Sequence, residues 1–239
     1  KAQELQRSIL PQHEYAFHSY DLYGVTLPAE VVGGDFFDYL EIGSDNDRIG
    51  IALGDAASKG VAAAAEAMYI SGALRMATTF EIKISPLMKR MNKLVNKIFS
   101  DDKFTSLFYG ELSTDQTGLF LYANAGHNPP IFIKKKSKKI KYLQPTGPVL
   151  GPAPEANYTV ENINFEKGDV LLIYSDGIID SSDENGEGFG EERLMKVLSE
   201  SKHLSPKEIA LLIIESVNKF SANGKYSDDK TVVVIKKTK

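Results

Sequence analysis

Four aspartates, Asp35, Asp55, Asp176 and Asp228, are the residues of this sequence best suited to chemistry. Each stands beside a glycine or a turn at the end of an apolar run, and such runs predict buried strands. A neighbouring glycine lets backbone approach a ligand closely. Carboxylates that converge without cysteine or histidine suit hard cations such as Mg²⁺ or Mn²⁺. One strand-end aspartate is usually a turn former, but four in this setting favour a metal site.

Two further segments were candidates for chemistry. Residues 54–60 run from a predicted strand into a predicted helix, but the order Lys59-Gly60 excludes a phosphate-binding loop, which needs Gly-Lys followed by Ser or Thr. We interpret Asp55 there as a metal ligand, with a tight strand-to-helix turn as the alternative. His127 stands between a glycine and a double proline, and we interpret it as a hydrogen-bonding turn residue, not a catalytic one.

Composition narrows the functional class. The chain has 239 residues, 42% of them apolar and 25% charged, as in an ordinary globular protein. The net charge of −4 gives no electrostatic case for nucleic acid or for direct membrane contact. The absence of cysteine excludes thiol catalysis and favours a reducing compartment, which we expect to be the cytoplasm. The basic run 134–139 is interpreted as solvated charge at a hairpin tip.

The elements that must position these aspartates follow from hydrophobic periodicity. The predicted order is strands, two helices, many strands, two helices and a last strand, without the β-α alternation of a doubly wound sheet. We therefore expect an α+β fold, a central antiparallel β-sandwich flanked by helices on both faces. The expected strands are 18–26, 36–42, 48–54, 104–112, 118–123, 131–135, 158–165, 170–174 and 231–235. The expected helices are 61–78, one capped by Ser85 with Pro86 after it, 190–198, and one begun by the capping box at 205–208.

Residues 1–12 are predicted to be an amino-terminal linker or regulatory region, in which residues 2–10 form a helix that Pro11 ends. We expect this helix to join an upstream sensor region, to transmit its signal and to form a homodimer contact, with a frayed linker as the alternative. Residues 13–239 are expected to form one domain. The polar, glycine-rich segment 181–190 is either a flap near the site or a solvated connection.

Five blocks together resemble a known family. They are Val-Gly-Gly-Asp-Phe-Phe-Asp at 32–38, Gly-Asp-x-x-x-Lys-Gly at 54–60, Asn-Ala-Gly-His-Asn-Pro-Pro at 124–130, Tyr-Ser-Asp-Gly at 174–177 and Asp-Asp-x-Thr at 228–231. In this order they resemble the bacterial branch of the metal-dependent type 2C protein phosphatases, the SpoIIE/RsbU-like family. The resemblance extends from about residue 5 to residue 236 and agrees with the sandwich expected from periodicity.

The resemblance implies a ligand set and a reaction. Asp35 and Asp55 would bridge two ions, Mn²⁺ or Mg²⁺, with the Ala56 carbonyl as a further ligand. Asp176 and Asp228 would complete the pair, whereas no ligand role is carried onto Asp38 or Asp229. Two such ions activate a shared water for in-line attack on a phosphoserine or phosphothreonine. No arginine lies in the five blocks, so Lys59 is the candidate side chain for binding the phosphate.

The resemblance also implies a phosphorylated anti-sigma-factor antagonist, a small protein of the STAS type, as substrate. One departure affects the expected level of activity: the family motif Gly-Asp-Val-Ser-Gly-Lys-Gly has glycine where this chain has Ser58. The alternatives are a catalytically weak or inactive binding module with this fold, and a receiver-like phosphate acceptor. The retained aspartates count against the first, and the missing β-α alternation counts against the second.

Overall fold

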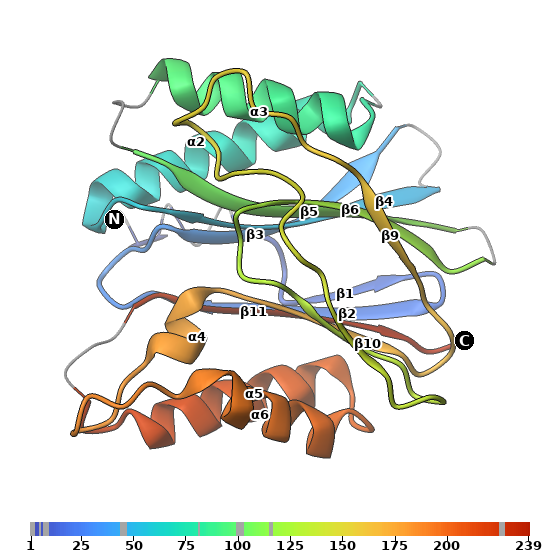
Figure 1. Ribbon diagram of the computed structural model, residues 1–239, viewed down its shortest axis with the longest axis vertical. Helices are drawn as coiled ribbons and strands as arrows, with labels where there is room; N and C mark the ends of the chain where they lie inside the picture. The colour runs from blue at the N-terminus through green and yellow to red at the C-terminus, as the bar shows by residue number, and fades with distance from the viewer. Residues whose placement is uncertain are drawn as a thin grey trace.

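The computed structural model describes residues 3–4, 6, 10–43, 47–80, 82–98, 103–114, 117–224 and 228–239. Two antiparallel sheets stack face to face, and a pair of helices covers the outer face of each (Figure 1). Sheets are apolar on the faces that another layer covers, and stacking two of them buries a shared core. The expected α+β sandwich with helices on both faces is confirmed.

One sheet has six strands in the order β1-β2-β11-β10-β7-β8. The last strand of the chain pairs with β2 on one side and with β10 on the other, so the carboxyl-terminal end lies in the middle of the sheet. Its residues 232–235 are all buried, as expected for an apolar strand covered on both faces. The strands are β1 Glu14–Phe17, β2 Tyr20–Leu27, β7 Ile131–Ile133, β8 Ile140–Tyr142, β10 Val170–Tyr174 and β11 Lys230–Lys237.

The other sheet has five strands in the order β3-β4-β5-β6-β9. The register of its first two strands places Asp35 directly opposite Asp55. On its other side, Asp55 lies opposite Ser106 of β5. The pairing therefore sets the positions of two of the four aspartates relative to each other. The strands are β3 Asp35–Ile42, β4 Arg48–Ala56, β5 Thr105–Ser113, β6 Leu119–Ala125 and β9 Glu161–Asn164.

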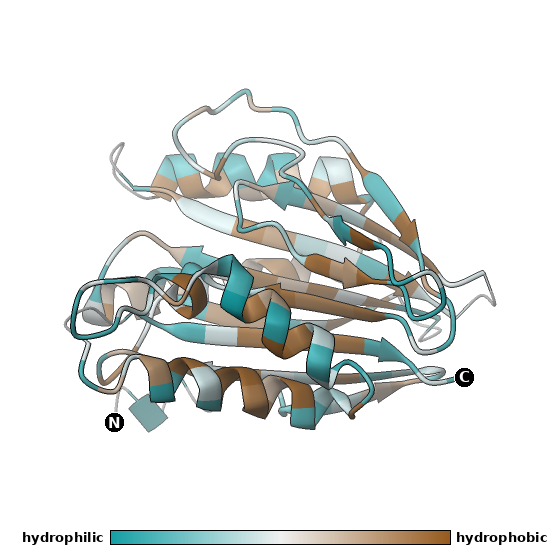
Figure 2. Ribbon diagram, turned by 60° about the horizontal axis from the view of Figure 1, so that its bottom comes forward, coloured by the Kyte–Doolittle hydropathy of each residue, from teal (hydrophilic) through white to brown (hydrophobic). Residues whose placement is uncertain are grey.

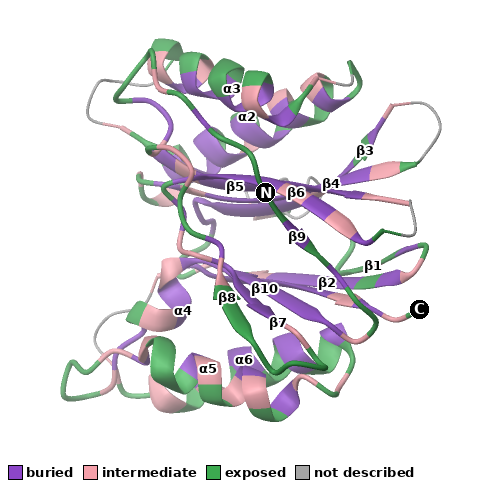
Figure 3. Ribbon diagram, turned by 45° about the vertical axis from the view of Figure 1, so that its right-hand side comes forward, coloured by how far each residue is buried: buried purple, intermediate pink, exposed green. Residues whose placement is uncertain are grey.

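Helices α2 (Gly60–Thr78) and α3 (Ile84–Ile98) cover the five-stranded sheet, and α5 (Gly190–Ser201) and α6 (Pro206–Phe220) cover the six-stranded sheet. Their apolar residues face the sheets (Figure 2), and the buried strands lie between the helical layers (Figure 3). The predicted capping box at the start of α6 is present, with reciprocal bonds between Ser205 and Glu208. Within the described residues, no helix is both long and apolar enough to cross a lipid bilayer.

Several sequence-based boundaries were wrong. The predicted strand 18–26 is the second half of a hairpin, because His18 takes a positive φ of 52° in the turn between β1 and β2. Ser85 does not cap α3, which begins at Ile84; its hydroxyl instead donates to the Tyr158 carbonyl oxygen at 2.7 Å. The short strand β8 and the one-turn helix α4 (Asp176–Asp180) were missed, since runs of three to five residues carry little periodic signal.

The amino-terminal segment contacts the sandwich near β3. Residues 3, 4 and 6 are helical, whereas Leu5 and Ile9, on which that prediction also rested, lie outside the described residues. The buried Gln6 side chain donates to the Gly33 carbonyl oxygen at 2.7 Å and accepts from the Gly33 amide at 3.2 Å. The division at residue 12, the sensor connection and the homodimer remain predictions. The sequence Asp-Asn-Asp at 45–47 predicts a turn before β4, and residues 45 and 46 of it also lie outside the described residues.

Candidate metal centre

The four predicted aspartates come from both sheets and meet at one end of the sandwich. Asp35 begins β3 and Asp55 lies near the end of β4, while Asp176 begins α4 directly after β10 and Asp228 precedes β11. These strand ends lie at the same end of the molecule, beside α4 in Figure 1. The negative charges of Asp176 and Asp228 act on Asp55 across the sandwich. The fold therefore brings together residues that are up to 193 positions apart in the chain, the separation of Asp35 and Asp228 (228 − 35).

The cluster has an excess of negative charge. Burial, and then the charge of Asp55, raise the pKa of the Asp35 carboxyl well above its usual range, although the Thr231 and Ser175 hydroxyls act in the opposite direction. Burial raises the pKa of Asp55 to about 7, and nearby carboxylates add to the shift. The pKa of Asp176 is also raised, again mainly by burial. A bound cation would favour the charged form of each carboxylate.

The donor set fits hard divalent cations. Oδ2 of Asp35 is buried and has no hydrogen-bond partner among the residues that the structure describes, so it is an acceptor that a cation would satisfy. In the described part of the chain, no three acidic or histidine side chains already converge on one point closely enough to hold an ion. Mg²⁺ commonly takes only one or two carboxylates and completes its shell with water and phosphate. Pairs of aspartates are therefore a sufficient protein contribution.

The backbone at Gly34 lies close to the end of β4 at Ala56. A Cβ atom placed on Gly34 would lie 2.8 Å from the Ala56 carbonyl oxygen, closer than real side chains allow. The Ala56 amide donates to the Gly34 carbonyl oxygen at 3.3 Å. The glycine therefore lets β3 lie against the carbonyl group that the family resemblance nominates as a ligand.

Asp229 organises the loop that leads into β3, a role that sequence reasoning did not assign. Its carboxylate accepts hydrogen bonds from the amides of Ala29 at 2.8 Å, Gly34 at 2.6 Å and Asp35 at 3.2 Å. A Cβ atom on Gly33 would lie 2.1 Å from its Oδ2. The adjacent glycines at 33 and 34 were the available sequence signal, because such pairs mark close backbone approach. Asp229 thus joins β11 to the start of β3.

Lys59 lies beside the acidic cluster. It is exposed, precedes the first residue of α2 and lines a cavity of about 130 Å³ together with Asp228 and Asp229. The amino end of α2 adds partial positive charge from its unpaired amides. A phosphoryl group near the aspartates would therefore meet positive charge on this side.

His127 is a buried hydrogen-bonding residue, as the sequence indicated. It is buried, its Nδ1 lies 2.8 Å from the Ser106 hydroxyl, and its amide donates to Oδ1 of Asn124 at 2.8 Å. Burial lowers the pKa of its ring to about 4, so the ring is neutral near pH 7. Its ring contacts β5 at Ser106, the residue that pairs with Asp55 on the neighbouring strand, and carries no charge near pH 7.

Asp38 is held in a closed ion pair with Arg75. Its carboxylate accepts from Nε of Arg75 at 2.6 Å, from Nη2 of Arg75 at 3.0 Å and from the Ser71 hydroxyl at 3.0 Å. Both partners belong to α2, so the pair fastens the helix to β3. This carboxylate already has its counter-charge.

Comparison with known proteins decides the family. The sequence profile described as Stage II sporulation protein E (SpoIIE) matches residues 45–238. The chain belongs to the SpoIIE family. Phosphoserine phosphatase RsbU of Bacillus subtilis (strain 168) is 29% identical over 98% of this chain and 67% of RsbU. Protein IcfG of Synechocystis sp. (strain ATCC 27184 / PCC 6803 / Kazusa) is 24% identical over 98% of this chain but only 40% of IcfG.

Solved structures agree with this membership at the level of the fold. The SiaA-PP2C domain of Pseudomonas aeruginosa superposes with a TM-score of 0.83 at 19% identity, covering 98% of this chain and 94% of that domain. The SpoIIE-family chain therefore has the fold of a PP2C-type phosphatase domain. It spans about two thirds of RsbU and less than half of IcfG.

Proposed function

We propose that this SpoIIE-family chain is a metal-dependent phosphatase of phosphoserine and phosphothreonine in a protein substrate. The observation that carries the proposal is the meeting of Asp35, Asp55, Asp176 and Asp228 at one end of the sandwich, with their negative charge in excess. The sequence similarity of the chain to the phosphoserine phosphatase RsbU supports the same reaction. When bound, two Mn²⁺ or Mg²⁺ ions would lower the pKa of a shared water and neutralise phosphoryl oxygens.

The residues of the chain divide this work. Asp35 and Asp55 would hold both ions from the five-stranded sheet, with the Ala56 carbonyl beside them. Asp176 and Asp228 would hold them from the six-stranded sheet. Lys59 and the amino end of α2 would orient the phosphoryl group, because both present positive charge at the cavity beside Asp228. Asp229 would fix the loop before β3 through its three amide bonds.

We propose a phosphorylated anti-sigma-factor antagonist of the STAS type as the substrate. The family membership and the similarity to RsbU support a small phosphoprotein partner in a regulatory pathway. A cytoplasmic location is part of this proposal, supported by the absence of cysteine from the sequence. A homodimer formed through the amino-terminal helix remains the proposed assembly.

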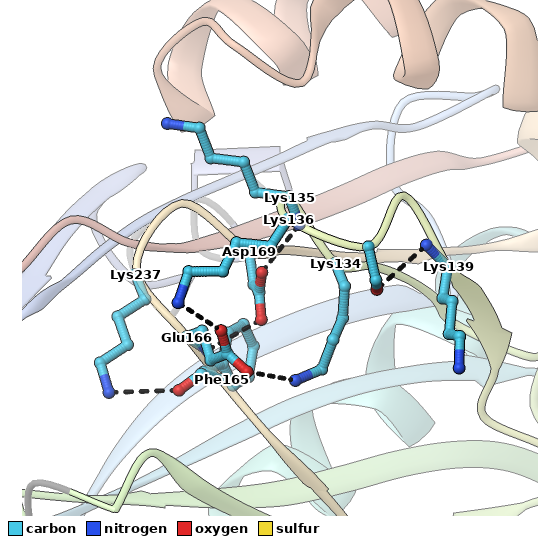
Figure 4. A network of polar contacts seen from close by, with 9 residues as sticks. Lys134, Lys135, Lys136, Lys139, Phe165, Glu166, Asp169 and Lys237 are labelled. Atoms are coloured by element: carbon cyan, nitrogen blue, oxygen red, sulfur yellow. Dashed lines mark hydrogen bonds and ion pairs between the residues drawn. The ribbon is translucent and has the colours of Figure 1, made fainter.

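The test is Mn²⁺-dependent hydrolysis of p-nitrophenyl phosphate and of a phosphoserine peptide. Asp55→Asn and Asp176→Asn should each reduce turnover by at least about 100-fold, because each removes a ligand of the ions that carry the chemistry. Glu166→Gln is the matched control: it removes a surface carboxylate that ion-pairs with Lys134 and Lys136 in a separate network (Figure 4). The proposal would be overturned if both aspartate variants kept wild-type turnover. It would also be overturned if the wild-type chain showed neither turnover nor Mn²⁺ binding in calorimetry.

A further inference from the structure

Glu66 is a buried carboxylate outside the acidic cluster. It lies on α2 and is 4% exposed. One of its oxygens accepts hydrogen bonds from two side chains. The Ser58 hydroxyl donates to its Oε1 at 2.8 Å, and Nζ of Lys103 donates to the same atom at 2.5 Å. Its other oxygen, Oε2, is buried and has no hydrogen-bond partner among the described residues. A buried charge that is only partly compensated calls for an explanation.

We propose that Glu66 is a positioning residue that fixes the loop 55–60, and with it Asp55 and the Ala56 carbonyl, through its bond to the Ser58 hydroxyl. This inference rests on the proposed function, since it concerns the loop that would carry two of the metal ligands. Glu66 itself touches neither the metal ions nor the substrate in this scheme.

The contacts of the loop explain why Glu66 can position it. The Ala57 amide donates to the Phe104 carbonyl oxygen at 3.1 Å, and Lys103 stands directly before Phe104. Glu66 binds both segments of this contact, because it holds Ser58 after β4 on one side and Lys103 before β5 on the other. Beyond these residues, Asp55 and Ala56 pair with Ser106 and Thr105 of β5. One side chain on a long helix thus fastens the loop to the strand beside it.

The sequence of the loop gives this bond a specific purpose. Ser58 stands where the family motif has glycine, and a glycine has no side chain that could donate to Glu66. If the loop is already ordered in the metal-free protein, its conformational entropy is lost on folding and does not weaken ion binding. Ligands must also be held within about half an ångström of their working positions. The Ser58–Glu66 bond would supply that order.

Stability alone does not account for Glu66. Replacing a buried ion pair by an apolar residue of similar size is often neutral or stabilising, because burying the charge costs about as much as the pairing returns. Lys103 is 32% exposed and would be solvated without its partner. Glu66→Leu should therefore fold at least as well as the wild-type chain while its loop loses an anchor. This separation of effects makes the proposal testable.

The experiment compares Ser58→Ala, Glu66→Leu and the rescue variant Glu66→Gln, whose amide oxygen still accepts from Ser58. Ser71→Ala is the matched control, because Ser71 lies on the same helix as Glu66 and its hydroxyl donates to another buried carboxylate, Asp38 of β3. Each protein is measured for Mn²⁺ affinity by calorimetry, for amide hydrogen exchange without metal, and for kcat and KM with p-nitrophenyl phosphate.

Ser58→Ala and Glu66→Leu should each weaken Mn²⁺ binding about fivefold, the worth of one lost hydrogen bond. Exchange at the amides of residues 56–59 should become about tenfold faster in the same two variants. With saturating Mn²⁺, KM should stay within about twofold of wild type, since Glu66 does not contact substrate. Glu66→Gln and Ser71→Ala should keep wild-type Mn²⁺ affinity within about twofold and wild-type exchange at 56–59.

Two results would overturn the inference. One is that Ser58→Ala and Glu66→Leu melt at a lower temperature but keep the wild-type Mn²⁺ affinity and the wild-type amide exchange rates at residues 56–59. The other is a loss of affinity in Ser71→Ala as large as that in Ser58→Ala, which would indicate a general effect on α2. If the wild-type chain binds no Mn²⁺, the proposed function fails, and exchange alone decides the positioning role: acceleration confined to 56–59 supports it, and uniform acceleration refutes it.

Discussion

Asp35 and Asp38 lie three residues apart on β3, and both are buried. Successive side chains of a strand point to opposite faces of its sheet, so these two face different layers. Asp38 faces α2, where Arg75 and Ser71 bind its carboxylate. Asp35 belongs to the face between the sheets, where burial, and then the charges of Asp55 and Asp229, raise its pKa. The same residue type on one strand is thus a closed ion pair on one face and an uncompensated charge on the other.

The surroundings of the two carboxylates distinguish a paired structural aspartate from a candidate metal ligand. Burial raises the pKa of both, but the guanidinium of Arg75 opposes the shift at Asp38, whereas the charge of Asp55 adds to it at Asp35. A buried charge is tolerated when a partner lies within hydrogen-bonding distance. In the proposed metal centre, a bound cation would be that partner for Asp35.

The largest expected effect is on catalysis at Asp35. Asp35→Asn should reduce Mn²⁺-dependent hydrolysis of p-nitrophenyl phosphate by about 1,000-fold, because the cations lose a shared ligand. The metal-free variant should be no less stable than wild type at pH 8, since it loses a buried charge without a counter-charge. Steady-state kinetics and urea denaturation check the two outcomes. A variant that keeps its turnover would place the metal centre elsewhere.

The next effect is stabilisation by the metal. Mn²⁺ at about 100 times its dissociation constant should raise the free energy of unfolding by about 2.7 kcal/mol in the wild-type chain and in Asp38→Asn. Asp35→Asn should show much less stabilisation at the same Mn²⁺ concentration. Thermal denaturation with Mn²⁺, and with EDTA as the metal-free reference, measures the difference. Equal stabilisation of Asp35→Asn and Asp38→Asn by Mn²⁺ would contradict the prediction that Asp35, and not Asp38, binds the metal.

A smaller effect is expected on stability at Asp38. Asp38→Asn should lower the free energy of unfolding by about 2 kcal/mol, because hydrogen bonds to a charged group are lost. Arg75 limits the damage, since its side chain is 44% exposed and can be solvated. Turnover per folded molecule should stay within about twofold of wild type. Urea denaturation measures the loss, and a fall in Mn²⁺ affinity would contradict a purely structural role.

The smallest effect is the pH dependence of the metal-free protein. The pKa of Asp55 is about 7 in the folded chain, against an ordinary value near 4. The folded state then binds more protons than the unfolded state between these values, so this contribution to stability is present below about pH 4 and is lost as pH rises through 7. We therefore expect the free energy of unfolding in EDTA to fall between pH 5 and pH 8.

Two controls accompany the pH measurement. Asp55→Asn should reduce the fall in stability with rising pH, because it removes the titrating carboxyl that the charges of Asp176, Asp228 and Asp229 act on. Excess Mn²⁺ should reverse the slope, since a cation binds the deprotonated carboxylates. Chemical denaturation at several pH values checks both outcomes, and a metal-free stability that rises steadily from pH 5 to pH 8 would contradict the assignment.

Much of the fold was predictable because its signals are local. The apolar stretches of β3 and β4 and the helical composition of α2 were located to within one or two residues. The capping box of α6 was recognised from four residues. In contrast, β1, β8 and α4 are too short to carry a period, and pairing with neighbouring strands or packing against helices defines them.

The sequence by itself determined the SpoIIE-like fold and nominated the aspartates, because strand periodicity, helix caps and the order of five short motifs are written along the chain. Only the tertiary structure decided which carboxylates lack a counter-charge. Whether Arg75 reaches Asp38, whether Glu66 reaches Ser58, and whether carboxylates gather around Asp55 all depend on contacts between separate elements. Electrostatic energy depends on distance and burial in space and not on separation along the chain, so it is set only when the two sheets meet.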